Sequence, residues 1–451
     1  MLEEQKAYQK SSRIYTFLVL LGIIFFMKVF KFGGASVKDA AAVKNVAEII
    51  KRFPSDELIV VVSAMGKITN HLERLTDAFF YKKENAEAVL NEIKTYHLNI
   101  VNQLFEDKNH PFYQDIENTF VELYWAIEDE PTNEYNHEYD QIVSMGEVIS
   151  SKIVSAYLNC AGIKNQWVDA RGLIQTDNTY REGKVNFELT EELVKTDLFP
   201  VVHANKIVIT QGFLGGTSEN FTTTLGREGS DYTAAILAYC ANAESVTIWK
   251  DVPGVLNADP KWFDNTVKIN ELTYQDAIEL TYYGATVIHP KTIKPLQNKN
   301  IPLYVRSFIK PEDEGTVVKD TKKRLPIPSF IFKVDQLLIS MQPKDFSFIA
   351  EDNLSSIFDT FFRHHVKIHV MQLSAINFSV CTDNDPRKIP ALLKELQENY
   401  KVLYNEGVEL CTIRYYDQAT IERVVIDKQV LLEQKSRYTV QLVLKNAGVL
   451  R

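Results

Sequence analysis

Cysteine is scarce in this chain of 451 residues, and basic residues are in deficit. The four cysteines show none of the paired spacings of a disulfide framework or a zinc site, so buried, reduced thiols are expected at Cys160, Cys240, Cys381 and Cys411. The 50 Lys and Arg residues face 59 Asp and Glu residues, a formal net charge of −9. This balance disfavours non-specific binding to nucleic acid or to an anionic membrane, and no nucleic-acid partner is expected.

Long apolar runs are also missing, with one short exception near the N-terminus. Residues Ile14 to Phe26 are apolar and follow three basic residues, which is typical of a leader. The run is short for a bilayer span, and no small-residue cleavage site follows it. Met27 stands directly before the first motif. We interpret residues 1–26 as a start-site extension or an apolar leader, with no membrane association and a cytoplasmic location expected.

The chain does contain a regular alternation of strand-like and helical segments. Lys28 to Phe32 is strand-like, the following apolar spacing is helical, and Leu58 to Ala64 is a nearly unbroken apolar run. Such runs between helices indicate strands buried on both faces of a parallel sheet. We therefore predict an α/β fold, a three-layer αβα sandwich with a mostly parallel central sheet. A helical insertion is expected over about His71 to Ile127.

The composition changes beyond Val318, which predicts a domain boundary. A charged segment with two prolines, DTKKRLPIPS, is typical of a linker. We expect a main domain over residues 27–318, a linker over 319–328 and a small C-terminal α/β region, ferredoxin-like, over 329–451. The last region has the order strand, helix, two strands, helix, which suits ligand sensing or dimerisation.

Two glycine clusters stand directly before helices, where backbone N–H groups can approach an anion closely. They are Lys31-Phe32-Gly33-Gly34-Ala35-Ser36 and Gly226-Arg227-Glu228-Gly229-Ser230-Asp231. Neither matches the P-loop pattern, and the HRD and DFG motifs of protein kinases are absent from the sequence. Taken alone, each cluster is a weak signal, because paired glycines after a strand more often form an ordinary tight turn.

The order of motifs along the chain is more specific than either cluster. The segments KFGGASV, VVVSAMGKITN, VSMGE, TTTLGREGSDYTAA, WKDVPGVLNADP and YGATVIHPKT together resemble the aspartate kinases of the amino-acid kinase family, over Lys28 to Val318. The tail resembles the ACT-type regulatory region of that family. The resemblance implies transfer of the γ-phosphate of ATP, with Mg²⁺, to the β-carboxylate of L-aspartate. The product would be 4-phospho-L-aspartate, at the start of lysine, threonine and methionine biosynthesis. A homodimer through the C-terminal region is also implied.

The chemistry of this reaction explains the catalytic candidates. A carboxylate nucleophile is already ionised at pH 7, so no general base is required, and the barrier lies in bringing two anions together. Lys31 is the candidate for stabilising the transferring phosphoryl group, and Asp231 is the candidate for holding Lys31 in place. Asp231 with Ser230 could instead cap a helix.

A zwitterionic substrate needs an anion for its ammonium group and a cation for a carboxylate. The resemblance implies Glu147 and Arg227 for these two roles, and a guanidinium offers the planar fork that a carboxylate fits. Either residue could, without the surrounding motifs, be an ordinary surface charge. Hydroxyl contacts to the substrate are implied for Ser63, Thr69, Thr224 and Ser230, any of which could singly be a turn or cap residue.

The nucleotide side departs from the family pattern. Many relatives have Trp-Thr-Asp where this chain has Trp249-Lys250-Asp251, and a lysine where it has Thr286. We expect Lys250 to supply a charge that Thr286 does not. No residue is predicted to bind a metal ion directly. The predicted nucleotide-binding residues are Gly33, Gly34, Ser36, Lys250, Asp251, Asn257, Asp259 and Lys261.

The tail departs further from the family pattern. The loop Pro343 to Ser347 lacks the glycine that related sensors of lysine or threonine usually carry, and His369 stands where an Asp or Asn often contacts the effector. We therefore expect that the effector pocket has decayed while a dimer interface remains.

Two alternatives to an active aspartate kinase stay open. The first is another amino-acid kinase, such as a glutamate or acetylglutamate kinase, against which the motif order and the ACT-like tail argue. The second is a catalytically weak regulatory or dimerisation partner. The altered nucleotide residues permit this second alternative, whereas the intact Lys31, Glu147, Arg227 and Asp231 oppose it.

Overall fold

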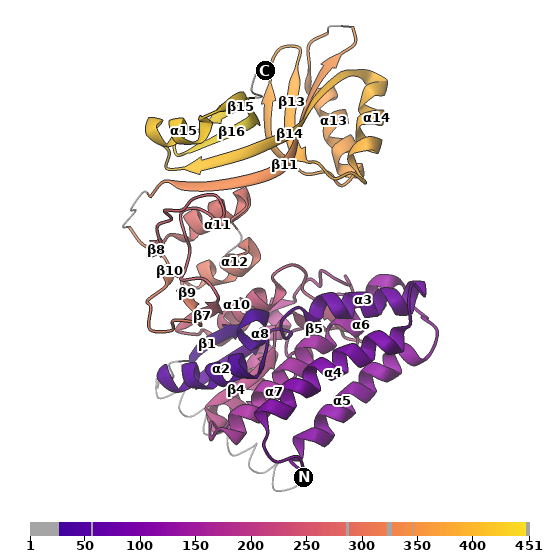
Figure 1. Cartoon of the computed structure of the whole chain (residues 1–451), viewed down its shortest axis with the longest axis vertical. Coiled ribbons are helices and arrows are strands. Elements are labelled where there is room, and N and C mark those ends of the chain that lie inside the picture. The colour runs from indigo at the N-terminus through magenta and orange to yellow at the C-terminus, as the bar shows by residue number, and fades with distance from the viewer. Residues whose placement is uncertain (1–26, 56, 286–287, 323–326, 346, 448–451) are drawn as a thin grey trace. The chain divides into compact units, whose positions relative to one another are not determined.

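The structure is a computed structural model that describes residues 27–55, 57–285, 288–322, 327–345 and 347–447 (Figure 1). The predicted leader, 1–26, lies outside the described residues. The chain divides into two compact units. The first contains the described residues up to Val255, Asn270–Ile278 and those of the range 287–322; the second contains 256–269, those of the range 279–286 and those from 323 onward.

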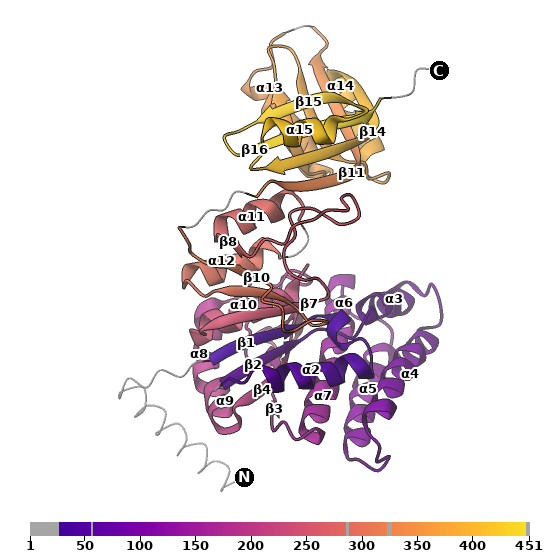
Figure 2. The same ribbon diagram turned by 60° about the vertical axis from the view of Figure 1, so that its left-hand side comes forward.

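A mostly parallel sheet of eight strands forms the centre of the first unit, in the order β3-β4-β2-β1-β7-β9-β10-β8 (Figure 2). β10 is antiparallel to β9, and the other neighbouring strands are parallel. β2 is buried along its whole length, as its unbroken apolar run predicts. The strands are β1 (Met27–Phe32), β2 (Glu57–Val62), β3 (Gln166–Trp167), β4 (Ile207–Gln211), β7 (Ser245–Lys250), β8 (Glu271–Leu272), β9 (Leu303–Ser307) and β10 (Thr316–Val318).

Helices cover both faces of this sheet. One face carries α2 (Ala40–Arg52) and α7 (Met145–Cys160), and the other carries α9 (Phe199–Asn205) and α10 (Gly229–Ala241). α8 (Phe187–Leu193) and α12 (Pro290–Asn298) pack against α10. The predicted α/β class with a mostly parallel central sheet is therefore confirmed.

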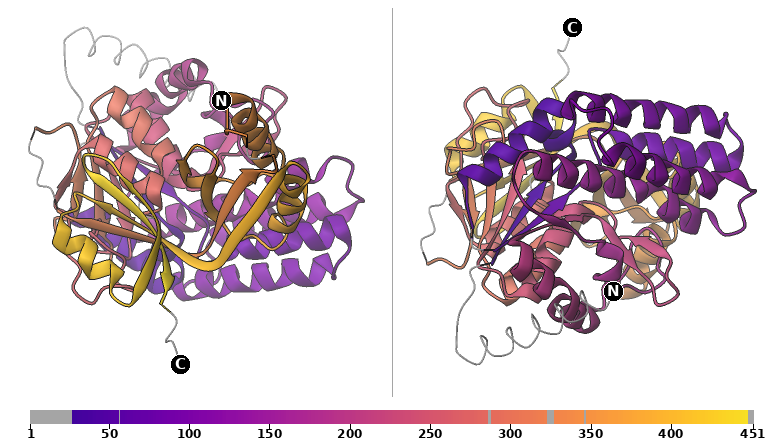
Figure 3. Two further views of the ribbon diagram at one scale, coloured as in Figure 1. Left: turned by 90° about the horizontal axis from the view of Figure 1, so that it is seen from above. Right: turned by 90° about the horizontal axis from the view of Figure 1, so that it is seen from below.

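The segment predicted as a helical insertion is helical, and Figure 3 shows its helices gathered at one end of the first unit. The helices there are α3 (Ile68–Tyr81), α4 (Ala86–Leu104), α5 (Phe112–Glu128) and α6 (Tyr135–Val143). A short hairpin of β5 (Leu214–Gly216) and β6 (Thr222–Thr224) packs against α6. Among the described residues, no helix combines the length and apolar content needed to cross a bilayer.

The second unit is built on one antiparallel sheet of six strands, in the order β12-β13-β11-β14-β16-β15. Two long strands, β11 and β14, pair with each other along most of their length. The predicted order of strand, helix, two strands and helix is present from β11 to α14. The elements are β11 (Ser329–Pro343), α13 (Glu351–Arg363), β12 (Ile368–Leu373), β13 (Phe378–Asp383), α14 (Ile389–Asn399), β14 (Tyr400–Arg414), α15 (Gln418–Val425), β15 (Lys428–Lys435) and β16 (Thr439–Asn446).

Two segments inside the range predicted for the main domain pack with the second unit instead. In the first of them, the Asn257 carbonyl accepts a hydrogen bond of 2.7 Å from the Phe330 N–H, and the Phe263 ring lies 4.9 Å from the Phe330 ring. The second segment contains the end of α11 (Tyr274–Tyr283), where Glu279 forms an ion pair with Arg414. These pairings depend on tertiary contacts, which the composition of the chain does not reveal.

Candidate active site

Lys31 is positioned by β1, which lies between β2 and β7. The strand ends at Phe32, and Gly33 and Gly34 lead into a short 3₁₀ turn, Gly34–Val37. A Cβ on Gly34 would lie 2.8 Å from the carbonyl oxygens of Ala64 and Gly66, so the backbone approach there requires glycine. A Cβ on Gly33 would lie 3.3 Å from the Lys31 ammonium. The paired glycines thus leave room for a second loop and for Lys31.

A cavity of about 720 Å³ opens at this point in the first unit. It is lined by every residue predicted for catalysis or substrate binding, and by Gly34. Their elements lie far apart in sequence, and the parallel sheet brings them to one edge. The predicted residues in the lining are Lys31, Gly34, Ser63, Thr69, Glu147, Thr224, Arg227, Ser230 and Asp231.

Two lysines converge on Asp231 in the first turn of α10. The Lys31 Nζ lies 2.6 Å from Asp231 Oδ1, and the Lys250 Nζ lies 3.1 Å from Oδ2. Burial would raise the pKa of Asp231, but the two ammonium groups outweigh it and lower that pKa to about 2. Asp231 is therefore ionised, and its side chain pairs with lysines, although a helix cap was the alternative interpretation.

Glu147 lies near the start of α7, and its side chain is buried. Its Oε1 accepts a hydrogen bond of 3.1 Å from the Ala64 N–H, while its Oε2 has no hydrogen-bond partner in the described part of the chain. Burial raises the pKa of Glu147 to about 8, against the opposing effects of that N–H and of Lys31. A buried carboxylate with one unsatisfied oxygen is a site for a cationic ligand group.

Arg227 is exposed at the cavity, on the loop before α10. Nothing within the described ranges forms a hydrogen bond or ion pair with its guanidinium. Thr224, in contrast, is buried, and its hydroxyl donates a hydrogen bond of 2.8 Å to Asp140. The guanidinium is therefore available to an anionic ligand, whereas the Thr224 hydroxyl already has an acceptor.

The residues predicted for the nucleotide are dispersed. Ser36 is buried and donates its hydroxyl to the Trp249 carbonyl at 3.2 Å, so a structural role is visible for it. Asp251 is exposed beyond the end of β7. The second unit contains Asn257, Asp259 and Lys261. Nucleotide contacts by all of these residues stay predictions.

The three in the second unit have local partners. Asn257 donates its side-chain amide to the Pro328 carbonyl at 3.0 Å and accepts from the Val267 N–H at 2.7 Å. The Asp259 carboxylate accepts from the Lys261 N–H at 2.9 Å. The first of these contacts joins residues 71 apart in the chain, and the other two lie within the segment 257–267.

The sequence reasoning missed several cavity residues, above all Arg181 and Tyr139. Arg181 lies between Tyr180 and Glu182 in a loop without periodicity, and Tyr139 lies in a helix with no recognised motif. A lone arginine in a loop is usually only solvated, so the sequence offered no signal for it.

The family resemblance implies a magnesium ion, and the described residues show which side chains the protein offers to it. They contain no group of three or more His, Cys, Asp or Glu side chains that could hold a metal ion. The Asp231 carboxylate is engaged by two lysines. These side chains do not fit a protein-built metal cage.

Taken together, the parallel sheet covered by helices on both faces, the glycine turns and the buried lysine–carboxylate cluster form a charged cavity at one edge of the sheet. Comparison with known proteins identifies the class further. The model of the amino acid kinase family matches residues 27–307. The chain therefore belongs to the amino acid kinase family.

Several aspartokinases are among the proteins that this chain resembles. The chain is 29% identical to lysine-sensitive aspartokinase 3 of Escherichia coli over 397 residues, 85% of this chain and 86% of that protein. It is 33% identical over 304 residues to a bifunctional aspartokinase/homoserine dehydrogenase of Zea mays, of which it spans 32%. The crystal structure of E. coli aspartokinase III with lysine and aspartate matches with a TM-score of 0.79 and 26% identity, over 93% of this chain and 96% of that one.

Proposed function

We propose that this chain is an ATP-dependent aspartate kinase, which transfers the γ-phosphate of ATP to the β-carboxylate of L-aspartate. One observation carries the proposal. The same cavity is lined by a lysine held by a buried aspartate, a buried carboxylate with a free oxygen, and an unpaired guanidinium. These three groups match the phosphoryl group, the ammonium and the α-carboxylate of the reactants. The structure of E. coli aspartokinase III with aspartate and ADP supports the same reactants.

The reaction consists of one displacement at phosphorus. An oxygen of the β-carboxylate forms a bond to the γ-phosphorus, the bond from that phosphorus to the β–γ bridging oxygen breaks, and ADP leaves with that electron pair. No proton moves, because the nucleophile is already ionised. Lys31 neutralises charge on the transferring group, and magnesium carried by ATP would neutralise the phosphates.

Asp231 and Lys250 keep Lys31 in place. Burial would lower the pKa of Lys250, but the Asp231 and Glu228 carboxylates raise it above its ordinary value, so Lys250 stays charged. Asp231 therefore has a second cation beside it whenever Lys31 turns toward a phosphate. The carboxylate of Asp231 is never left buried and uncompensated, a state that is strongly destabilising.

The test is a coupled assay of ADP release by the purified full chain with aspartate, glutamate or no acceptor. Aspartate-dependent release that is abolished in Lys31→Ala supports the proposal. Equal or faster release with glutamate would instead favour another amino-acid kinase. Absence of acceptor-dependent release, with ATP and magnesium in excess, would favour the regulatory or dimerisation role.

A homodimer through the second unit, in the cytoplasm, is also part of this proposal. β12 is an edge strand, and Met371 and Leu373 on it are 48% and 51% exposed. An apolar edge strand is a ready site for pairing with another chain. Light scattering after size exclusion gives the mass of the assembly and tests this part. A Met371→Lys variant with the same dimer mass as the parent would contradict pairing at this edge.

A further inference from the structure

The cavity of the first unit is lined by a second arginine, Arg181, whose place is determined by tertiary contacts. The backbone N–H of Arg181 donates a hydrogen bond of 2.8 Å to Asp140 Oδ2. Its guanidinium lies over the Tyr139 ring, 4.2 Å from the ring centre. Tyr139 is in turn fixed by a hydrogen bond of 2.6 Å from its hydroxyl to Glu73. Both the backbone and the side chain of Arg181 are therefore oriented.

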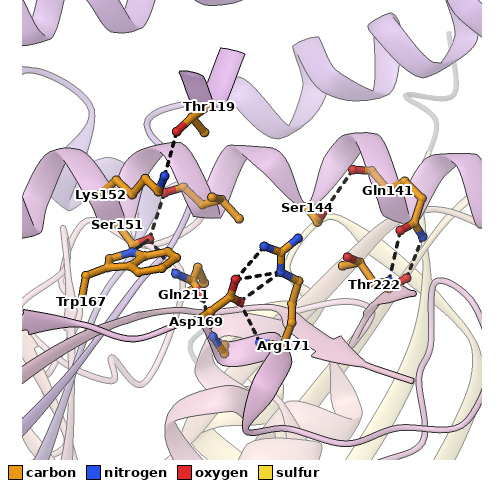
Figure 4. A network of polar contacts seen from close by, with 12 residues as sticks. Thr119, Gln141, Ser144, Ser151, Lys152, Trp167, Asp169, Arg171, Gln211 and Thr222 are labelled. Carbon is orange, nitrogen blue, oxygen red and sulfur yellow. Dashed lines mark hydrogen bonds and ion pairs between the residues drawn. The ribbon is translucent and has the colours of Figure 1, made fainter. Parts of the chain in front are cut away.

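Asp140 joins the Arg181 loop to the strand that precedes Arg227. This carboxylate is fully buried, and it also accepts hydrogen bonds from the N–H and the hydroxyl of Thr224, at 2.9 and 2.8 Å. The next residue, Gln141, exchanges two hydrogen bonds with the backbone of Thr222 (Figure 4). Two consecutive residues of α6 thus form hydrogen bonds with both ends of β6, Gln141 with Thr222 and Asp140 with Thr224.

The two arginine-bearing segments are in close contact at Gly226. A Cβ on Gly226 would lie 3.2 Å from the Arg181 carbonyl oxygen and 3.3 Å from Glu182 Cγ. Gly226 also has a φ of 74°, a backbone angle that residues with a side chain rarely adopt. Arg181 and Arg227 therefore project from neighbouring backbone segments into one cavity, and the described residues leave both guanidinium groups without an ion pair.

We infer that Arg181 is a second guanidinium contact for the α-carboxylate of the amino-acid substrate, beside Arg227, and that Asp140 is the positioning residue for it. The inference rests on the proposed function. Carboxyl groups outnumber cations in the lining, where Glu73, Glu147, Glu182, Glu228 and Asp231 face Lys31, Arg181 and Arg227. A second guanidinium reduces this excess and so lowers the electrostatic cost of bringing in an anionic substrate.

The test is steady-state kinetics of full-chain variants with both substrates varied. Arg181→Met should raise the KM for aspartate about ten- to a hundredfold, the effect of losing a charge-assisted contact, with KM for ATP and kcat little changed. Arg181→Lys should raise the KM for aspartate less than Arg181→Met does, since lysine keeps the positive charge but not the planar fork of the guanidinium. Arg74→Met is the matched control, because Arg74 pairs with Glu84 on the surface and lies outside the cavity lining.

Asp140 is tested by a conservative pair of variants. Asp140→Asn can still accept both N–H groups through its amide oxygen and donate to the Thr224 hydroxyl, so it should raise the KM for aspartate less than Asp140→Ala does. A KM for aspartate within twofold of the parent in Arg181→Met, or a rise confined to the KM for ATP, would overturn the inference. Should Arg181→Met fail to fold, Arg181→Gln, which also removes the charge, decides by the same criterion. A parent chain without aspartate-dependent turnover would instead remove the proposed function, and the inference with it.

Discussion

The two units of this protein bury charge in different ways. In the first, Lys31, Glu147 and Asp231 are buried around one cavity, and an oxygen of Glu147 has no partner among the described residues. In the second, Arg414 is buried against Glu279, and Lys428 pairs with Glu409. A charge pair away from a cavity supports a fold, whereas buried charges that line a cavity, with one oxygen lacking a partner, indicate a ligand site. The following predictions test this contrast.

The largest effect is expected at Lys31. Lys31→Ala should lower kcat at least about a hundredfold, the usual cost of removing a group that stabilises charge in the transition state. Thermal unfolding should change little, since Asp231 keeps Lys250 as a partner. The measurement is ADP release at saturating substrates beside a thermal melt. A variant that keeps more than about a tenth of the parent turnover would refute the role of Lys31.

The opposite pattern is expected at Arg414. Arg414→Met removes the ion pair with Glu279 and should destabilise the second unit by about 2 to 3 kcal/mol, less than the loss of a fully buried pair because Glu279 is partly exposed. The melting temperature should fall by several degrees. At a temperature below the transition, KM and kcat should stay close to the parent values. If the variant lost turnover at a temperature where it is still folded, the contrast between the two units would be wrong.

A third effect is expected at the substrate carboxylate. Arg227→Lys should raise the KM for aspartate about tenfold or more, because a point charge does not replace the bidentate fork. The KM for ATP should change little. Arg74→Lys serves as the control for the same substitution on the surface. An unchanged KM for aspartate would place Arg227 outside the substrate site.

The sequence predicted the framework of this site better than its detail. The predicted strand over Lys28 to Phe32 and the apolar run from Leu58 form β1 and β2, because unbroken apolar runs suit strands inside a sheet. The motif residues converge because the sheet is parallel, which the apolar strands already indicated. Arg181 and Asp140 were missed, since their position depends on hydrogen bonds between residues 41 apart in the chain. A nucleotide contact by Ser36 stays a prediction, and the contact visible in the structure is the hydrogen bond from its hydroxyl to the Trp249 carbonyl.

A smaller effect concerns the pH dependence of substrate binding. Glu147 must be ionised to hold an ammonium group, and its pKa in the free cavity is raised to about 8 by burial. The ionised fraction therefore rises with pH, and the KM for aspartate should fall several-fold between about pH 7 and about pH 8.5. Glu147→Gln should raise the KM for aspartate and abolish that dependence. A KM that increases with pH over this range would contradict ionisation of Glu147 on binding.

The smallest effect is expected from amino-acid effectors, because His369, at the position predicted to contact an effector, already has partners within the second unit. His369 Nε2 lies 3.0 Å from Asp383 Oδ1, and the Lys333 ammonium lies 3.2 Å from Nδ1, so both ring nitrogens have partners. The hydrogen bond from His369 holds the pKa of Asp383 well below its usual range, and that carboxylate stays ionised. An effector's ammonium group would have to displace these contacts.

We therefore expect less than twofold inhibition by lysine or threonine, a coupling of about 0.4 kcal/mol or less. The measurement is the initial rate at subsaturating aspartate with millimolar lysine, threonine or both. His369→Asp provides the matched variant, since it restores the acidic residue type that relatives often carry at this position. Inhibition well above twofold in the parent chain would mean that the second unit binds an effector despite the paired histidine. The contrast between a charged cavity in one unit and paired charges in the other would then fail at this point.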